Sequence, residues 1–230
     1  LHTLKVVKGT IAKGATVSIE VDKKNRMSIA RNHTATHILL SALQKTLGSH
    51  VEQAGSYVGS DRLRFDFNHS QAMTAEEIKK VEEIVNNEIK AGLEIVTAEM
   101  SLEDAKKTGA MALFGEKYGA VVRMVKMGEF STELCGGTHV SNTGNIGLFR
   151  IVTESSVAAG VRRIEGVTGK GVINYLNSRE QLIHDTAAAM KLANVKDLAT
   201  KAASCDFKLN FTPATLSKFV FTGPGHKTPT

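Results

Sequence analysis

The residues in this sequence best suited to chemistry form two pairs of metal-ligating side chains. His33 and His37 are four positions apart, and Cys135 and His139 are separated by the same interval. On a helix, side chains at this spacing are neighbours, with Cβ atoms about 5–6 Å apart, so two imidazoles can share one metal ion. Three imidazoles and one thiolate match the preference of zinc for nitrogen and sulfur ligands in a tetrahedron.

Two glycines separate the members of the second pair. Gly136 and Gly137 permit a backbone turn that would bring the thiolate and the imidazole together. Either pair alone is a weak signal, because an HxxxH pair is more often a coincidence or a satisfied pair in the core. Two such pairs in one small domain favour a zinc site.

The motif differs from that of the zinc proteases, which place a glutamate directly after the first histidine as general base. Thr34 occupies that position here, which argues against a peptidase. Four protein ligands usually close a tetrahedral site, and closed sites are structural. Catalysis needs a fifth position, a displaceable ligand or chemistry beside the metal. Spacing does not decide between a structural and a catalytic zinc site. It also allows that one histidine contacts a ligand without binding the metal itself.

A helix is expected to carry the first pair. Apolar residues recur at helical spacing over residues 28–47, and Gly48 provides a stop. At about 100° per residue, His33 and His37 fall at the border of the apolar face. Their imidazoles are therefore expected neither in the centre of the core nor fully in solvent.

Further strands and helices are predicted from hydrophobic patterning. Leu63, Phe65 and Phe67 alternate with polar residues, as in a half-buried strand, and Thr74 with Glu77 forms a capping box before a second helix. The other predicted elements are strands within 4–21, 51–67, 120–127 and 147–153, a short helix at 101–107, and a helix from 169 to about 193. They predict an α+β fold in which helices pack on an antiparallel sheet, with a zinc site between a helix and a Gly-rich loop.

Composition limits the class of protein. The chain has 230 residues, a net charge of +6 and two cysteines, Cys135 and Cys205. No apolar run approaches the ~18–20 residues of a membrane span, and two cysteines are too few for a disulfide framework. We therefore expect a cytoplasmic protein without a membrane partner, whose positive charge suits a polyanion such as RNA.

Four segments resemble the editing domain of alanyl-tRNA synthetases and its free-standing relatives, the trans-editing proteins. They follow the family's order and read RNHTATHILLSAL (31–43), GAMALFGEKYG (109–119), STELCGGTHVSNTGNIGLFRI (131–151) and ESSVAAGVRRIEGVTG (154–169). The resemblance covers about residues 1–175. It implies the end of a preceding β-domain at 1–25, an editing domain at 26–172, and a helical extension with an unassigned tail at 173–230.

The resemblance also implies a reaction and its residues. The family hydrolyses the ester that joins serine or glycine to tRNA(Ala), so the acceptor end of tRNA(Ala) is the expected partner. The family's zinc-ligand positions fall on His33, His37, Cys135 and His139, and Gln53 matches a glutamine of the editing pocket. Because the first residue is Leu rather than Met, we expect a fragment of a longer synthetase that lacks the aminoacylation core.

The mechanism we expect is zinc-assisted attack of water on the aminoacyl ester. Gln53 or backbone amides near Gly136 and Gly137 would stabilise the oxyanion. Cys135 as a covalent nucleophile is the competing mechanism, which we rank lower because a metal-bound thiolate is less free to attack.

Editing must also spare the correct alanyl ester. Adding or removing one small group changes the binding free energy of an amino acid by only ~1–3 kcal/mol, so a second site that hydrolyses the wrong ester raises fidelity. A buried polar group that pairs with the serine hydroxyl would be left unpaired by alanine. The candidates for this group are the hydroxyls of Thr34 and Thr36, and Gln53.

RNA contact is predicted for Arg162 and Arg163, because guanidinium groups bind phosphate bidentately; the alternative is an ordinary solvated surface. Two other functions remain. One is a threonyl-type editing domain, which the segments CGGTH and GVRRIE disfavour. The other is a non-catalytic, zinc-containing tRNA-binding module. Beyond about residue 195 the resemblance fades, and we expect no catalytic role for Cys205 or His226.

Overall fold

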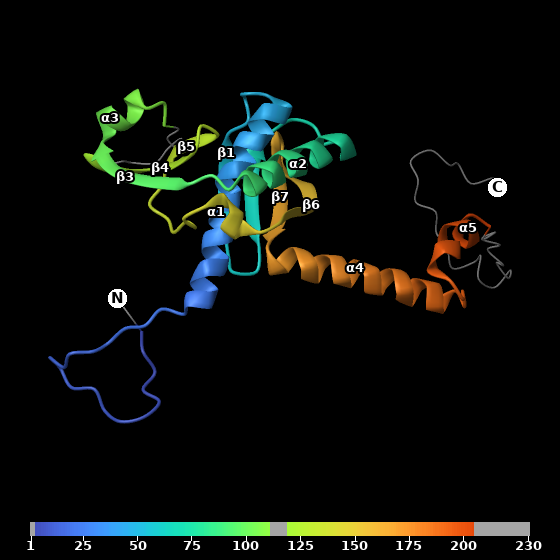
Figure 1. Ribbon diagram of the computed structural model, residues 1–230, viewed down its shortest axis with the longest axis horizontal. Coiled ribbons are helices and arrows are strands. Elements are labelled where there is room, and N and C mark those ends of the chain that lie inside the picture. The colour runs from blue at the N-terminus through green and yellow to red at the C-terminus, as the bar shows by residue number, and fades with distance from the viewer. Residues whose placement is uncertain (1–2, 111–118, 205–230) are drawn as a thin grey trace, which may run out of the picture. The chain divides into compact units, whose positions relative to one another are not determined.

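A computed structural model describes residues 3–110 and 119–204 of the chain (Figure 1). The chain divides into two compact units, Leu1–Leu176 and Asn177–Thr230. Most of segment 109–119, one of the four that resemble the editing domain, lies outside the described residues, as do Cys205 and His226. None of the described helices is long and apolar enough to cross a membrane.

Helix α1 (Lys23–Leu47) lies in the first unit and contains the first histidine pair, His33 and His37. It begins five residues earlier than its apolar pattern predicts, because the Asp22 side chain caps it by accepting a hydrogen bond from the N–H of Asn25. Its polar first turn carries no hydrophobic signal. From Ala30 to Leu43 it is almost entirely buried.

A four-stranded antiparallel sheet packs on α1. Its strand order is β1 (Gln53–Val58), β2 (Leu63–Asn68), β7 (Val161–Thr168) and β6 (Phe149–Ala158). Leu63, Phe65 and Phe67 of β2 are fully buried, as their alternation predicts, but Asp66 on the opposite face is buried as well, in its pair with Arg163. In register, Phe65 of β2 lies opposite Ile164 of β7 in the same core.

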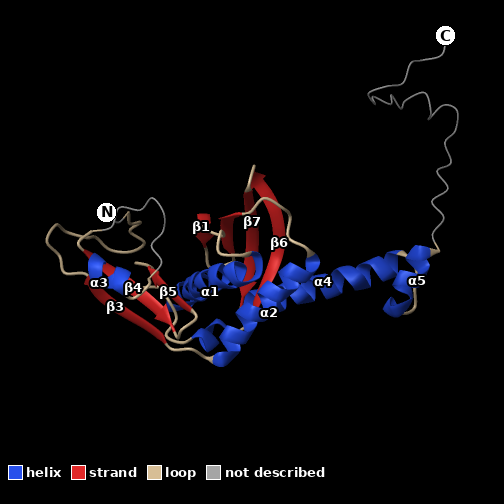
Figure 2. Cartoon of the chain, turned by 90° about the horizontal axis from the view of Figure 1, so that it is seen from above, coloured by secondary structure: helices blue, strands red, loops and turns tan. Residues whose placement is uncertain are grey.

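A second sheet, which the sequence did not predict as separate, lies on the other side of α1 (Figure 2). It is antiparallel, with the order β3 (Ile95–Ser101), β4 (Val121–Met127), β5 (Ser131–Leu134). Helix α3 (Leu102–Lys107) follows β3 and packs on this sheet. Since α1 contacts β1, β2 and β7 of one sheet and β5 of the other, it joins both sheets.

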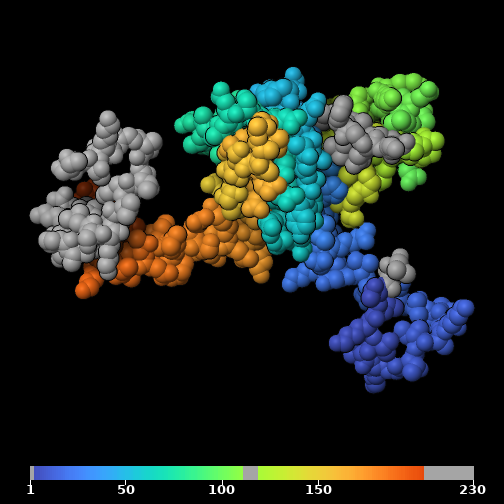
Figure 3. Space-filling view, turned by 180° about the vertical axis from the view of Figure 1, so that it is seen from behind, coloured from blue at the N-terminus to red at the C-terminus, as the bar shows by residue number. Residues whose placement is uncertain are grey.

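Helix α2 (Ala75–Ala91) completes the core of the first unit. Its predicted capping box is confirmed: the Thr74 hydroxyl accepts from the N–H of Glu77, and the Glu77 carboxylate accepts from the N–H of Thr74. The helix lies beside β6, as the teal and amber surfaces in Figure 3 show. The α+β class, with antiparallel sheets packed by helices, is therefore confirmed.

The predicted strands within 4–21 do not form. In the described chain, residues 3–22 contain no helix or strand, and apolar side chains such as Leu4 and Val7 are exposed. A strand needs a partner for its backbone groups, and the alternation in this segment meets none in the described chain.

The predicted C-terminal helix is α4 (Lys170–Ala189). It ends a few residues earlier than expected, at a turn in which Lys191 adopts a positive φ of 56°. Two short elements follow it, the 3-10 turn η2 (Val195–Asp197) and α5 (Leu198–Ala203).

Candidate metal centre

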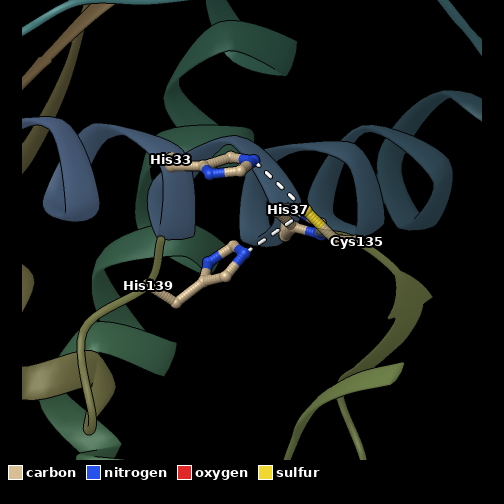
Figure 4. A group of neighbouring side chains, drawn as sticks. All are labelled: His33, His37, Cys135 and His139. Atoms are coloured by element: carbon tan, nitrogen blue, oxygen red, sulfur yellow. Dashed lines mark hydrogen bonds between the residues drawn. The ribbon is translucent and has the colours of Figure 1, made fainter. Parts of the chain in front are cut away.

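The two predicted pairs lie together in space (Figure 4). His33 and His37 project from α1, while Cys135 and His139 lie on the segment that follows β5. One potential ligand atom from each residue falls within 4.8 Å of the others. Sγ of Cys135 is 3.4 Å from Nε2 of His33 and 3.4 Å from Nε2 of His139. Among the described residues, this is the group of His, Cys, Asp or Glu side chains that lie close enough together to hold a metal ion.

An arginine that the sequence analysis missed orders the loop of the second pair. Arg123 of β4 donates to the carbonyl oxygens of Cys135 at 2.9 Å and Gly137 at 2.7 Å. The N–H of Cys135 donates in turn to the Arg123 carbonyl at 2.9 Å. These bonds continue the β4–β5 pairing, so the sheet edge sets the position of the thiol.

Of the two glycines between Cys135 and His139, only Gly137 is required by space. A Cβ at this position would lie 2.0 Å from Cε1 of His33, whereas one at Gly136 would meet nothing within 4 Å. The N–H of Gly137 also lies 3.4 Å from Sγ of Cys135. The loop can therefore approach α1 only with glycine at 137.

Thr34 lies beside His139 in the structure. Its hydroxyl is fully buried, lies 3.1 Å from Nδ1 of His139 and accepts a hydrogen bond from the N–H of Val140. It is not among the residues that line the adjoining cavity. The structure thus makes Thr34 a support for His139, and its role as a reader of the serine hydroxyl stays a prediction.

A small cavity of about 60 Å³ adjoins the cluster. Besides the ligand-type residues, its lining includes Thr36, Gln53, Ser56, Phe65 and Glu133. Gln53 stands at the start of β1, so β1 brings it to the face where α1 presents His33 and His37. The Thr36 hydroxyl donates to the carbonyl of Asn32, one turn earlier in the helix.

The surroundings of Cys135 favour its thiolate. Burial raises the pKa of this thiol, but hydrogen bonds with His139, His33 and His37 outweigh burial and lower the pKa to about 3. The thiolate is the form that binds metals. Burial lowers the pKa of His139, and the charges of the other two histidines act in the same direction.

His37 has the opposite shift. Burial lowers its pKa, yet the charge of Glu133 and a hydrogen bond with Cys135 outweigh burial and raise the pKa to about 10. A metal ion that took this imidazole would therefore have to compete with a proton.

Glu133 was not singled out in the sequence, although it lies two residues before Cys135 in the quoted segment 131–151. Its Oε2 lies 2.8 Å from Nδ1 of His37, and its Oε1 accepts a hydrogen bond from the Ser131 hydroxyl. Alternation along β5 is the signal that could have found it, because Glu133 and Ser131 share one face of the strand.

Arg162 and Arg163 are both paired with carboxylates. Arg162 forms a bidentate pair with Glu154, and Arg163 forms one with Asp66, in which both distances are 2.7 Å. Neither arginine lines the cavity. Contact with RNA would require these pairs to open or to be shared, and it stays a prediction.

Comparison with known proteins agrees with the resemblance in the quoted segments. A family model described as "Threonyl and Alanyl tRNA synthetase second additional domain" matches residues 122–165. Alanine–tRNA ligase 1 of Lachnoclostridium phytofermentans is 56% identical over 190 residues, which cover 83% of this chain and 22% of the relative.

Two further relatives show similar coverage. The alanine–tRNA ligase of Bacillus anthracis is 51% identical over 87% of this chain and 23% of its own length. That of Alkaliphilus oremlandii is 50% identical over 91% of this chain and 24% of its own length. The chain thus spans less than a quarter of the relatives it matches. The chain therefore matches the editing domain of alanyl-tRNA synthetases.

Proposed function

We propose that this chain hydrolyses the ester of serine or glycine mischarged onto tRNA(Ala), and that the reaction depends on zinc. The observation that carries the proposal is the group of three imidazoles and one thiolate beside a small cavity lined by Gln53 and Thr36. The identity to alanine–tRNA ligases supports tRNA(Ala) as the substrate carrier.

The four residues fit a zinc ion by their chemistry. His33, His37, Cys135 and His139 offer the nitrogen and sulfur donors that zinc prefers, and the low pKa of the thiol supplies the deprotonated ligand. A bound zinc would supply Lewis-acid chemistry for the attack of water on the ester. We propose that Cys135 acts as a ligand and not as the nucleophile.

Two of the lining residues, Gln53 and Thr36, have tasks in this proposal, and Gln53 is a candidate for both of them. The Gln53 amide stabilises the charge that develops on the ester oxygen, and backbone N–H groups near Gly136 assist it. Thr36 or Gln53 pairs with the serine hydroxyl.

The proposal extends to the rest of the chain. Residues 1–25 would complete a preceding β-domain and residues 173–230 would begin a C-terminal extension, in keeping with relatives more than four times longer than the matched region. Exposed lysines such as Lys5 and Lys8 suit contact with tRNA. The cytoplasm is the proposed location, where Cys135 stays a free thiol or a metal ligand.

A second function, a non-catalytic zinc-containing tRNA-binding module, is favoured by the completeness of the ligand set, since four protein ligands typically form a closed structural site. The two functions differ in whether a free amino acid is released from the mischarged tRNA. We expect the chain to release serine from seryl-tRNA(Ala) and glycine from glycyl-tRNA(Ala), and to leave alanyl-tRNA(Ala) intact.

The test measures loss of each radiolabelled aminoacyl-tRNA with the chain and without it. Gln53→Ala should slow serine release by about 10²-fold if its amide stabilises the oxyanion. Gln71→Ala, which changes an exposed glutamine outside the cavity lining, is the control. Binding of tRNA and zinc without release of serine would favour the binding module.

A further inference from the structure

Glu133 is a buried carboxylate at the border of the metal centre. The side chains of Glu133 and His37 are each 8% exposed, and Oε2 of the glutamate lies 2.8 Å from Nδ1 of the histidine. Its other oxygen, Oε1, accepts a 2.7 Å hydrogen bond from the Ser131 hydroxyl. Within the described chain, His37 and Ser131 are the side chains in polar contact with this carboxylate.

This contact determines which nitrogen His37 can offer. Because Nδ1 faces Glu133, Nε2 is left for the cluster of His33, Cys135 and His139. Metal-ligating histidines commonly give their second N–H to a carboxylate, which sets the tautomer and the orientation of the ring. Here Nδ1 and Oε2 are 2.8 Å apart, but the N–H is not directed at the oxygen, so the attraction we infer is between the carboxylate and the positive charge of the whole site.

Charge balance leads to the same assignment. A divalent cation held by one thiolate and three neutral imidazoles carries an excess positive charge. Burying an uncompensated charge is costly, and a carboxylate within contact distance of a ligand compensates it. Glu133 is in that position, whereas Glu129 of the preceding turn is exposed and pairs with Lys126.

We propose that Glu133 is a positioning residue of the metal centre, which holds His37 with Nε2 toward the ion and balances the charge of the site. Ser131 holds Glu133 in turn. This inference rests on the proposed zinc site and assigns roles to two residues beyond the four ligands.

The test is a zinc titration of the full chain, stripped of metal, in competition with a chelator of known affinity. Glu133→Gln keeps the shape of the side chain and removes its charge; it should weaken zinc binding about 10- to 100-fold. Ser131→Ala should weaken it in the same direction by less. Glu129→Gln is the matched control and should bind zinc as the wild type does. With Co²⁺ in place of zinc, Glu133→Gln should also shift the ligand-field absorption, because the His37 ring reorients.

The outcomes separate the inference from the function on which it rests. Wild-type zinc affinity in Glu133→Gln would overturn the role of Glu133 and leave the metal site standing. Failure of the wild-type chain itself to bind zinc would overturn the metal site and the inference with it. If Glu133→Gln does not fold, as circular dichroism would reveal, Ser131→Ala decides, and wild-type affinity in that variant overturns the inference.

Discussion

Gly137 lies where the loop after β5 passes closest to His33. Any Cβ at 137 would lie 2.0 Å from the imidazole, so Gly137→Ala must displace His33 or the loop. We expect this change to lower zinc content after dialysis and to cost about 1–3 kcal/mol of unfolding free energy, as overpacking typically does. Zinc analysis and thermal unfolding measure the two effects.

The neighbouring Gly136 provides the control, because a Cβ there meets nothing within 4 Å. Gly136→Ala should keep its zinc and its stability. Equal loss of zinc in both variants would show that the loop needs flexibility and not space at 137.

Cys135 should be a thiolate across the physiological pH range even without metal. Its folded-state pKa is lowered to about 3 by hydrogen bonds from three histidines, despite burial, so the thiol is deprotonated at any pH above that value. In metal-free protein carrying Cys205→Ser, thiolate absorbance near 240 nm should stay constant between about pH 5 and pH 8. Absorbance that rises with a midpoint near the ordinary thiol pKa of about 8.5 would contradict this prediction.

The four ligand-type residues of the candidate site were predictable from the sequence, because their side-chain chemistry is specific. Histidine and cysteine have few uses in such spacing, so the four residues that gather beside Gln53 could be named in advance. Arg123 could not, because guanidinium groups are common on surfaces and only the fold brings this one to the loop carbonyls. Glu133 could be found only through its alternation with Ser131 on β5, once that strand is placed. The contact of Thr34 with His139 could not be predicted either, because the two residues are 105 positions apart.

At the scale of elements, Asn86 joins α2 to β6. Its side chain accepts from the N–H of Phe149 at 3.0 Å and donates to the carbonyl of the same residue at 2.9 Å. Asn86→Ala removes both bonds and leaves two backbone groups without these partners, which should cost about 1–3 kcal/mol. Denaturant unfolding measures the loss.

The next residue in the helix is a matched control. Asn87 is exposed, and Asn87→Ala should change stability by no more than about 0.5 kcal/mol. A similar loss in both variants would mean that helix propensity and not the bond to β6 determines the effect.

Elements with a strong period were predictable and the others were not. The capping box of α2 and the alternation of β2 are local signals, and both elements formed as predicted. Strand β3 was not predicted although Ala98 and Met100 alternate with polar residues, because alanine and glutamate have little preference for strands. The opposite error occurred within residues 4–21, where alternation is present but the described chain supplies no pairing strand.

At the scale of the whole molecule, the first unit contains every residue of the candidate site. The cluster, the cavity and Glu133 all lie within Leu1–Leu176, and the family match at 122–165 falls in the same unit.

The most direct test of the account is the rate of serine release from seryl-tRNA(Ala) by the whole chain after metal removal. The account predicts that a chelator abolishes release, that added zinc restores it, and that alanyl-tRNA(Ala) stays intact throughout. Undiminished release by fully metal-free protein would contradict the central claim that the three histidines and Cys135 serve hydrolysis through a bound zinc ion.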